Sequence, residues 1–444
     1  MTAETQALVD ELAELLRIPS VSADPAHRAD VTTAGEWVRD FVRRAGGEAE
    51  LVDWHGQPLA IGELRASSGA DGAPTVLCYG HFDVQPPAPL DLWESEPFEP
   101  TARDGWLYAR GVADDKGQLF MLLKAAEQLA AEGALPVNVR FACDGEEETG
   151  GHSIVEFLEA DERGADVAVI FDGGMLAPGK PCFNLATRGL NYFHVTVSTG
   201  ERDLHSGVYG GAALNGLHAL MQTLSGVLPH NGRVPEPLRA GMILPTEAEL
   251  ASWATLNPGA AELADQGARP RDPLAAEEFY VRTWAEPSVD VHGLKGGEAT
   301  LQKTVLPVLG EANVSIRLVA GQDPDEIAAV FERLLREAAP AGAGVEVVRW
   351  SSAPAGVVPA DAPAVRLGQD AFEAALGVRP LLVRTGGSLP IVPALADQGI
   401  PAIVTGFDLP NGNVHSPNER LLLEYLPLGV ATARELFRRF AALG

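Results

Sequence analysis

The fold is decided by the stretch Thr75-Val76-Leu77-Cys78-Tyr79-Gly80-His81-Phe82-Asp83, in which an apolar run ends in a histidine and an acid. An apolar run that ends at a glycine is typical of a buried strand. We expect His81 and Asp83 to point to the same side, because side chains two residues apart on a strand share a face. A carboxylate beside an imidazole orients the ring for metal binding. A hydrogen-bonded histidine without a metal is the structural alternative at this point.

Similar apolar runs recur along the chain and alternate with amphipathic segments. They predict strands at 137–141, 167–171 and 402–404, and the amphipathic segments predict helices at 118–132 and 364–376. Strands that alternate with helices indicate an α/β sheet with parallel character. In such sheets, ligands gather beyond the carboxyl ends of the strands.

The pattern of the sequence changes after residue 185. Residues 193–198 alternate between apolar and polar side chains, as in a strand with one buried face. Together with later helices and strands, they predict a small α+β unit of the βαββαβ type. We therefore expect one α/β domain in two parts, residues 1–185 and 353–444, with a smaller domain inserted at residues 186–352. The segment 230–300 is rich in Pro, Gly and Ala, and its pattern predicts no clear element.

Composition and charge narrow the class of protein. The 444 residues, 46% of them hydrophobic, are enough for a sizeable core and two or three domains. The formal net charge of −28 argues against nucleic acid or an anionic membrane as a partner, because both repel an acidic surface. No apolar run approaches the ~18 residues of a membrane helix, so we expect a soluble, cytoplasmic protein. The three cysteines lie far apart, which favours buried free thiols over disulfides.

Side chains that can bind metal ions follow several of the predicted strands. They are His81 with Asp83, the triplet Glu146-Glu147-Glu148, Asp172, Asp114 in an intervening loop, and His415 after the last strand. Acidic groups that converge at one sheet edge repel one another unless cations lie between them. Histidine with carboxylate ligands suits Zn²⁺, and also Mn²⁺ or Co²⁺. Each motif alone also fits a solvated charge run, a turn or an ordinary loop, but their joint position at strand ends predicts a metal site.

Seven segments together resemble a known family. They are Gly80 to Pro86, Arg110 to Gly117, Glu147 to Gly150, Asp172, Asp203 to Gly211, Ser315 to Val319, and His415 to Glu419. In this order they are similar to the dizinc exopeptidases, which include aminoacylases, carboxypeptidase G, succinyl-diaminopimelate desuccinylase and carnosinase-type dipeptidases. The similarity covers nearly the whole chain and is closest to the cytosolic nonspecific dipeptidase branch. It implies a catalytic α/β domain with a mixed sheet flanked by helices, and an inserted ferredoxin-like lid or dimerisation domain.

The resemblance also implies a role for each residue of the metal site. The implied cofactors are two divalent ions per chain, with zinc expected and manganese or cobalt as alternatives. The implied ligands are His81 and Asp172 for one ion, Glu148 and His415 for the other, and Asp114 as a bridge between the two.

Glu147 would be the general base, which takes a proton from a metal-activated water and gives it to the leaving amine. The triplet Glu146 to Glu148 alone leaves open which adjacent pair is used. The family pair directly precedes Ser/Thr-Gly, which favours the last two. The resemblance further implies that Asp83 orients His81 and that the peptide bond Asp114–Asp115 is cis, as in relatives.

Further residues resemble substrate-binding groups of the family. His205 resembles a histidine that reaches the partner subunit's active site and stabilises the oxyanion, which implies a homodimer. Arg317 resembles the arginine that binds the terminal carboxylate of the substrate, a group that fits its planar fork. Thr304, Gly387 and Ser388 are additional candidates for substrate contacts. A surface-loop histidine and a strand-end salt bridge are the structural alternatives for His205 and Arg317.

The leading hypothesis is a metallopeptidase that hydrolyses dipeptides or similar short amides with a free C-terminal carboxylate. The alternative among enzymes is an N-acyl-amino-acid deacylase or a carboxypeptidase with the same two-metal site. Asp172 argues against this alternative, since several deacylase branches have Glu at that place. A binding or regulatory protein on an inherited hydrolase scaffold is the alternative outside enzymes. Such a protein would lack the base or a ligand, but every one of these residues is present.

Overall fold

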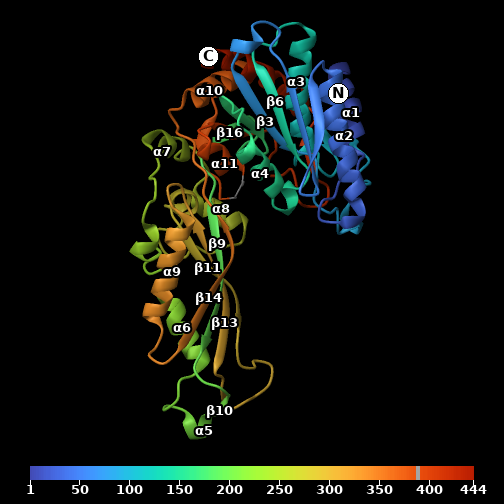
Figure 1. Cartoon of the computed structure of the whole chain (residues 1–444). Helices are drawn as coiled ribbons and strands as arrows, with labels where there is room; N and C mark the ends of the chain where they lie inside the picture. Colours follow the sequence, from blue (N-terminus) through green and yellow to red (C-terminus); the bar gives the residue numbers. More distant parts are fainter. Residues whose placement is uncertain (387–390) are drawn as a thin grey trace. The chain divides into compact units, whose positions relative to one another are not determined.

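The computed structural model describes residues 1–386 and 391–444, and the chain forms two compact units (Figure 1). The first unit contains Met1–Leu185, Val358–Val383 and residues 391–444, and the second contains Ala186–Val357 and residues 384–386. The first unit is thus built from separate stretches of the chain, with the second inserted between them. The predicted catalytic role of one unit and the predicted lid role of the other stay predictions.

A mixed eight-stranded sheet forms the centre of the first unit, in the order β1-β2-β6-β3-β7-β16-β8-β15. Its strands are β1 (Glu48–Trp54), β2 (Gln57–Leu64), β3 (Thr75–His81), β6 (Asn138–Asp144), β7 (Val167–Phe171), β8 (Cys182–Asn184), β15 (Leu381–Val383) and β16 (Ala402–Thr405). The central strands β6, β3, β7 and β16 run parallel, whereas β1 and β2 form an antiparallel pair at one edge. β6 and β7 are buried along their whole length, as expected for parallel strands covered on both faces. The predicted α/β class is confirmed.

Helices cover this sheet (Figure 1). They are α1 (Ala3–Leu16), α2 (Arg28–Arg44), α3 (Lys116–Ala131), α4 (His152–Ala160), α10 (Pro363–Leu376), α11 (Ile391–Asp397) and α12 (Tyr425–Phe440). Of these, α1 and α12 pack on other helices rather than directly on the strands of the sheet. Helix α3 packs on β3 and is buried on most of its sides. Its first residue, the buried Lys116, donates hydrogen bonds to the carbonyl oxygens of Leu15 (3.1 Å) and Ile18 (2.6 Å). These bonds tie the end of α1 to the beginning of α3.

A small three-stranded sheet brings two distant segments of the first unit together. β17 (Arg420–Leu422) pairs with β5 (Trp106–Tyr108), which also pairs with β4 (Thr101–Arg103). Because β17 and β5 are antiparallel, the residues before β17 lie beside the residues after β5. These are the loops that carry His415 and Asp114, so this sheet places two predicted ligands near each other.

The second unit has a four-stranded antiparallel sheet in the order β11-β13-β9-β14. Its main elements are β9 (Gly189–Ser198), α6 (Gly216–Ser225), β11 (Ser288–Lys295), β13 (Leu309–Leu318), α9 (Pro324–Ala338) and β14 (Gly344–Ala353). This βαββαβ order is the ferredoxin-like arrangement that the resemblance implied. Every second residue of β9 is buried, because one face of the sheet packs on α6 and α9.

Residues 230–300, which the sequence pattern did not assign, contain short helices and one strand. α7 (Glu247–Trp253) and α8 (Gly259–Asp265) precede β11. The second half of β11 is exposed, and its register with β13 shifts between Val291 and Gly293. An exposed strand with a bulge has only a weak apolar alternation, which explains why the sequence pattern did not reveal it.

Within the described ranges, the helices are too short or too polar to cross a bilayer. The cysteines Cys78, Cys143 and Cys182 are buried free thiols, as predicted. Burial raises the pKa of Cys182 to about 12, so this thiol stays protonated at neutral pH.

We expect Phe331 to be a main support of the second unit. Its ring stacks on Phe193 with centroids 4.5 Å apart, and both side chains are buried. Phe331→Ala should lower the free energy of unfolding by about 3–5 kcal/mol, because it leaves a cavity beneath the sheet. Urea unfolding followed by circular dichroism measures this change. Arg333→Ala, on the exposed side of the same helix, is the control, and an equal effect of both substitutions would contradict this role.

Candidate metal centre

The predicted metal ligands meet beyond the ends of the parallel strands of the first unit. β3, β6 and β7 are parallel neighbours, so their carboxyl ends lie at one edge of the sheet. The loops joined by β5 and β17 bring the remaining ligands to the same place. Among the described residues, two groups of three side chains could each hold a metal ion: His81 with Asp114 and Asp172, and Asp114 with Glu148 and His415.

Asp114 belongs to both groups, and its two oxygens face different histidines. Oδ1 lies 2.9 Å from Nε2 of His81, and Oδ2 lies 2.9 Å from Nε2 of His415. Nε2 of His415 is also 3.0 Å from Oε2 of Glu148, and Nε2 of His81 is 4.0 Å from Oδ1 of Asp172. A carboxylate that offers one oxygen to each of two groups has the geometry of a bridging ligand.

The donor atoms fit divalent ions. Each group offers one imidazole nitrogen and two carboxylate oxygens, and these atoms lie within 4.8 Å of one another. Such mixed nitrogen and oxygen sets suit Zn²⁺, and also Mn²⁺ or Co²⁺. His81 is fully buried, whereas the side chain of His415 is about half exposed. The two groups thus differ in their access to solvent.

The electrostatics of this edge also favour cations. Burial raises the pKa of Asp172 to about 8; the charge of His81 opposes this shift, and that of Asp114 adds to it. Burial tends to lower the pKa of His81, but hydrogen bonds to Asp114 and Asp83 outweigh it and hold that pKa well above its usual value. The carboxylate of Asp172 therefore tends to retain a proton in the absence of other positive charge. Divalent cations would relieve the same repulsion.

Asp83 connects the first ligand to the turn that carries Glu147 and Glu148. Nδ1 of His81 lies 3.1 Å from the backbone oxygen of Asp83 and 3.3 Å from its carboxylate Oδ1. The same carboxylate accepts hydrogen bonds from the backbone N–H groups of Glu147 and Glu148, at 3.2 Å each. Asp83 is fully buried. It therefore directs Nε2 of the imidazole toward the ligand group and fixes the position of the turn.

The members of the glutamate triplet point to different places. Glu148 belongs to the second ligand group. Oε1 of Glu146 instead accepts a hydrogen bond from the backbone N–H of Ser153 (2.7 Å), near the beginning of α4. Glu147 lies near His81 and Glu148: burial and the charge of Glu148 raise its pKa above the usual value, against the effect of His81. This geometry supports a role for Glu147 and Glu148 at the site and gives Glu146 a structural one.

Glu419, to which the sequence analysis gave no role, joins the two loops of the metal centre. Its buried carboxylate is 2.6 Å from Nη1 of Arg110. It also accepts hydrogen bonds from the backbone N–H groups of Gly111 (2.9 Å), Ala113 (2.9 Å) and Asp114 (3.1 Å). The peptide bond that follows Asp114 is cis, as the resemblance implied. Glu419 thus holds the backbone that presents the bridging carboxylate.

Gln85 is a second residue without a role in the sequence analysis. Its Nε2 donates a hydrogen bond to Oε2 of Glu148 at 2.8 Å, which orients this carboxylate. Both Gln85 and Glu419 lie within segments that resemble the family. Their position in these motifs was the only sequence signal that could have identified them.

His205 lies in the second unit, on the short strand β10 (Leu204–His205). β10 pairs with β12 (Val305–Leu306), which begins directly after Thr304. The backbone N–H of Gly207 donates to Nδ1 of His205 at 3.0 Å. The neutral ring therefore carries its proton on Nε2, which makes Nε2 a hydrogen-bond donor.

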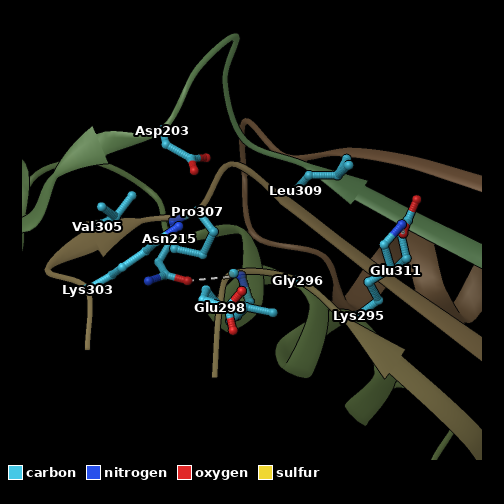
Figure 2. Close-up of a pocket in the computed structure, with 12 residues that line it drawn as sticks. Asp203, Asn215, Lys295, Gly296, Glu298, Lys303, Val305, Pro307, Leu309 and Glu311 are labelled. Carbon is cyan, nitrogen blue, oxygen red and sulfur yellow. Dashed lines mark hydrogen bonds and ion pairs between the residues drawn. The ribbon is translucent and has the colours of Figure 1, made fainter. Parts of the chain in front are cut away.

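A pocket of about 420 Å³ in the second unit is lined by Asp203, by Lys303 and Val305 on either side of Thr304, and by residues near the beginning of α6 and the end of β11 (Figure 2). A carboxylate oxygen of Asp203 accepts a hydrogen bond from the backbone N–H of Val308 (3.1 Å). This bond links the segment before β10 to the segment after β12. The lining of the pocket is rich in charged side chains and contains none of the predicted metal ligands. The pocket is therefore distinct from the candidate metal centre.

Arg317 lies on β13, close to a second arginine. The largely buried Arg188 donates a hydrogen bond to Oγ of Ser288 (2.9 Å), which is the cross-strand partner of Arg317. Burial lowers the pKa of Arg188 to about 10, and the charge of Arg317 adds to this effect. Two neighbouring guanidinium groups favour an anion between or beside them. Gly387 and Ser388, the other predicted substrate contacts, lie outside the described residues.

The chain is similar to several known proteins. The model of Peptidase family M20/M25/M40 matches residues 77–439. The chain is 28% identical to the Cys-Gly metallodipeptidase DUG1 of Saccharomyces cerevisiae, over 95% of this chain and 92% of that protein. It is 31% identical to the Beta-Ala-His dipeptidase of Rattus norvegicus, over 72% and 68%. The crystal structure of human carnosine dipeptidase 1 is similar, with a TM-score of 0.73, 26% identity, and coverage of 99% of this chain and 96% of that one.

We expect Asp114→Ala to weaken metal binding at both sites, because one carboxylate serves both groups. His415→Ala should weaken only one site. Isothermal titration of the metal-free protein with Zn²⁺, checked by elemental analysis, should give about two ions per wild-type chain and about one for His415→Ala. His55→Ala, which removes an exposed histidine of the first unit, is the control and should still bind both ions. Unchanged stoichiometry and affinity in Asp114→Ala would contradict the bridging geometry.

Proposed function

The chain belongs to Peptidase family M20/M25/M40, and we propose that it is a metal-dependent dipeptidase for substrates with a free C-terminal carboxylate. One observation carries this proposal: two groups of imidazole and carboxylate ligands share Asp114, and Glu147 lies beside them. The relatives named as dipeptidases support the substrate class. The proposed cofactors are two divalent ions, with zinc favoured by the donor atoms. We also propose a cytoplasmic location, which the acidic composition suits.

Glu147 is the proposed general base. When bound, the two divalent ions would polarise the scissile carbonyl and make a nearby water more acidic. Glu147 accepts a proton from this water and gives it to the leaving amine nitrogen. Its raised pKa suits both steps, since the carboxylate must first take up a proton and then release it. The hydrogen bond from its backbone N–H to Asp83 keeps the turn in place during both transfers.

His205 is the proposed donor to the developing oxyanion. Its Nε2 carries the proton in the neutral ring, because Nδ1 accepts from Gly207. A fixed donor aimed at the place where negative charge develops lowers the barrier of acyl transfer. We propose that His205 acts in the site of a partner subunit, so that the active form is a homodimer. The exposed apolar side chains of Val208 and Tyr209 beside it support a protein contact at this loop.

Arg317 is the proposed binding group for the C-terminal carboxylate. A planar guanidinium can bind a carboxylate through two parallel hydrogen bonds. Arg188, close by, adds a second positive charge. We propose Thr304, Gly387 and Ser388 as further substrate contacts.

Glu147→Gln should abolish the proton transfer while keeping the shape of the side chain. With metal ions bound, kcat for a panel of dipeptides should fall by about 10²–10⁴-fold. Glu146→Gln is the matched control, because the Glu146 side chain accepts a hydrogen bond from the backbone of Ser153 and an amide oxygen can replace it. Its activity should stay close to that of the wild type.

The same panel should include N-acetyl and N-succinyl amino acids. If the wild type hydrolyses these acylated amino acids faster than dipeptides, the protein is a deacylase. Wild-type activity of Glu147→Gln on dipeptides, with both ions still bound, would contradict the proposed mechanism.

A mixing experiment tests whether His205 acts across subunits. His205→Ala and Glu147→Gln should each be inactive alone. In a heterodimer of the two, one site has an intact Glu147 and an intact His205 from the partner subunit. Random mixing gives about half heterodimers, so about a quarter of the wild-type activity should return. Heterodimers that form, as mass spectrometry can show, but stay inactive would contradict action across subunits.

A further inference from the structure

One face of the second-unit sheet carries a row of aromatic and imidazole rings. Phe193 and Val314 belong to the core beneath α6 and α9. Their neighbours on β9 and β13 point to the opposite face, because side chains alternate along a strand. We call the four rings on this opposite face the ring row: His292 on β11, Tyr192 and His194 on β9, and Trp350 on β14.

The rings of the ring row are nearly parallel. Tyr192 stacks on His292, with centroids 5.4 Å apart and an angle of 11°, and on Trp350, at 6.0 Å and 9°. His194 stacks on Trp350 at 4.9 Å and 2°. Each imidazole is also held by a hydrogen-bond contact of 2.8 Å to a polar side chain of β13. The ring row is therefore held in place before any ligand binds.

The ring row is ordered but only partly covered. Trp350 is 57% exposed, and His292 is also exposed. Trp350 and His194 border a hollow of about 320 Å³. Exposed rings gain stability when another flat group stacks on them, because both surfaces leave water. The ring row therefore has the properties of a binding surface for a flat side chain.

The proposed carboxylate-binding residue lies on the same face, one row away. Leu190 is the cross-strand partner of Arg317, and Tyr192 follows two residues later on β9. Such diagonal neighbours have Cβ atoms about 7–8 Å apart, which is within reach of aromatic side chains. An amino acid whose carboxylate binds Arg317 can therefore extend its own side chain to the edge of the Tyr192 ring, whose two faces stack on His292 and Trp350.

We propose that the ring row binds the side chain of the C-terminal residue of the substrate and favours aromatic residues at that position. This inference rests on the proposed function, which assigns the C-terminal carboxylate to Arg317. The pair of guanidinium groups selects the carboxylate, and the ring row selects a flat side chain beside it. Asp290, the cross-strand partner of Ser315, lies near the ring row and would repel an acidic side chain.

Steady-state kinetics of the metal-loaded enzyme with Ala-Phe and Ala-Ala tests the inference. The wild type should have the higher kcat/KM for Ala-Phe. Tyr192→Ala should reduce this preference by about three- to tenfold, the range expected for one aromatic contact. The loss should appear as a higher KM for Ala-Phe, because this aromatic contact holds the substrate and the transition state equally.

Two further variants separate the loss of the ring from other effects. Tyr192→Phe keeps the ring and should keep the preference for Ala-Phe. Leu274→Ala removes an exposed apolar side chain elsewhere in the second unit and should change neither substrate. Trp350→Leu changes a mostly exposed ring, which does not support the core, and should also reduce the preference.

The outcomes distinguish this inference from the proposed function. If the wild type hydrolyses both dipeptides without preferring Ala-Phe, the inference is overturned and the proposed function stands. The same holds if Tyr192→Ala and Trp350→Leu leave the ratio of the two kcat/KM values unchanged. If the metal-loaded wild type hydrolyses neither Ala-Phe nor Ala-Ala nor any other dipeptide, the proposed function fails as well.

Discussion

The candidate metal centre depends on one buried carboxylate, that of Asp83. It lies 3.3 Å from Nδ1 of His81 and accepts the backbone N–H groups of Glu147 and Glu148. A buried carboxylate is costly unless hydrogen bonds compensate for the lost water, and here they do. The same bonds fix an imidazole, a proposed ligand and a proposed base relative to one another. The site is thereby organised by the protein, and the ions need only occupy it.

Glu419 likewise fixes the position of metal-site residues, here Asp114 and the loop of His415. Its carboxylate is paired with Arg110 and accepts three backbone N–H groups, the last of them from Asp114. A buried ion pair gains little stability over apolar packing, because both charges lose their water. The Arg110–Glu419 pair instead fixes position, because it joins the loop of Asp114 to the loop of His415. The pairing of β17 with β5 brings these loops together, so the small sheet and the ion pair depend on each other.

The sequence predicts those parts of the molecule in which burial leaves a strong pattern. β3, β6 and β7 are covered on both faces, so their apolar runs are easy to recognise. These runs correctly predicted which polar residues lie at or just after the end of each strand. β11 is half exposed and bulged, so it left no such pattern. Residue type alone does not separate three adjacent glutamates, although their place before Thr-Gly favours the last two. In the structure, Glu146 bonds to Ser153, whereas Glu148 joins the second ligand group. Arg188 and the ring row belong to no motif, because cross-strand register, which one sequence does not reveal, brings them together.

The charge of the protein also shows why local cations matter for substrate binding. A formal charge of −28 repels a substrate carboxylate at long range. At physiological salt this repulsion is screened beyond about 8 Å, whereas partly buried charges close to the substrate are screened much less. In the proposed complex Arg188 and Arg317 would be such charges, and each lies near the other despite mutual repulsion. The charge of Asp290 offsets part of this repulsion at Arg188, and in the proposed complex the C-terminal carboxylate of the substrate would add a second negative charge.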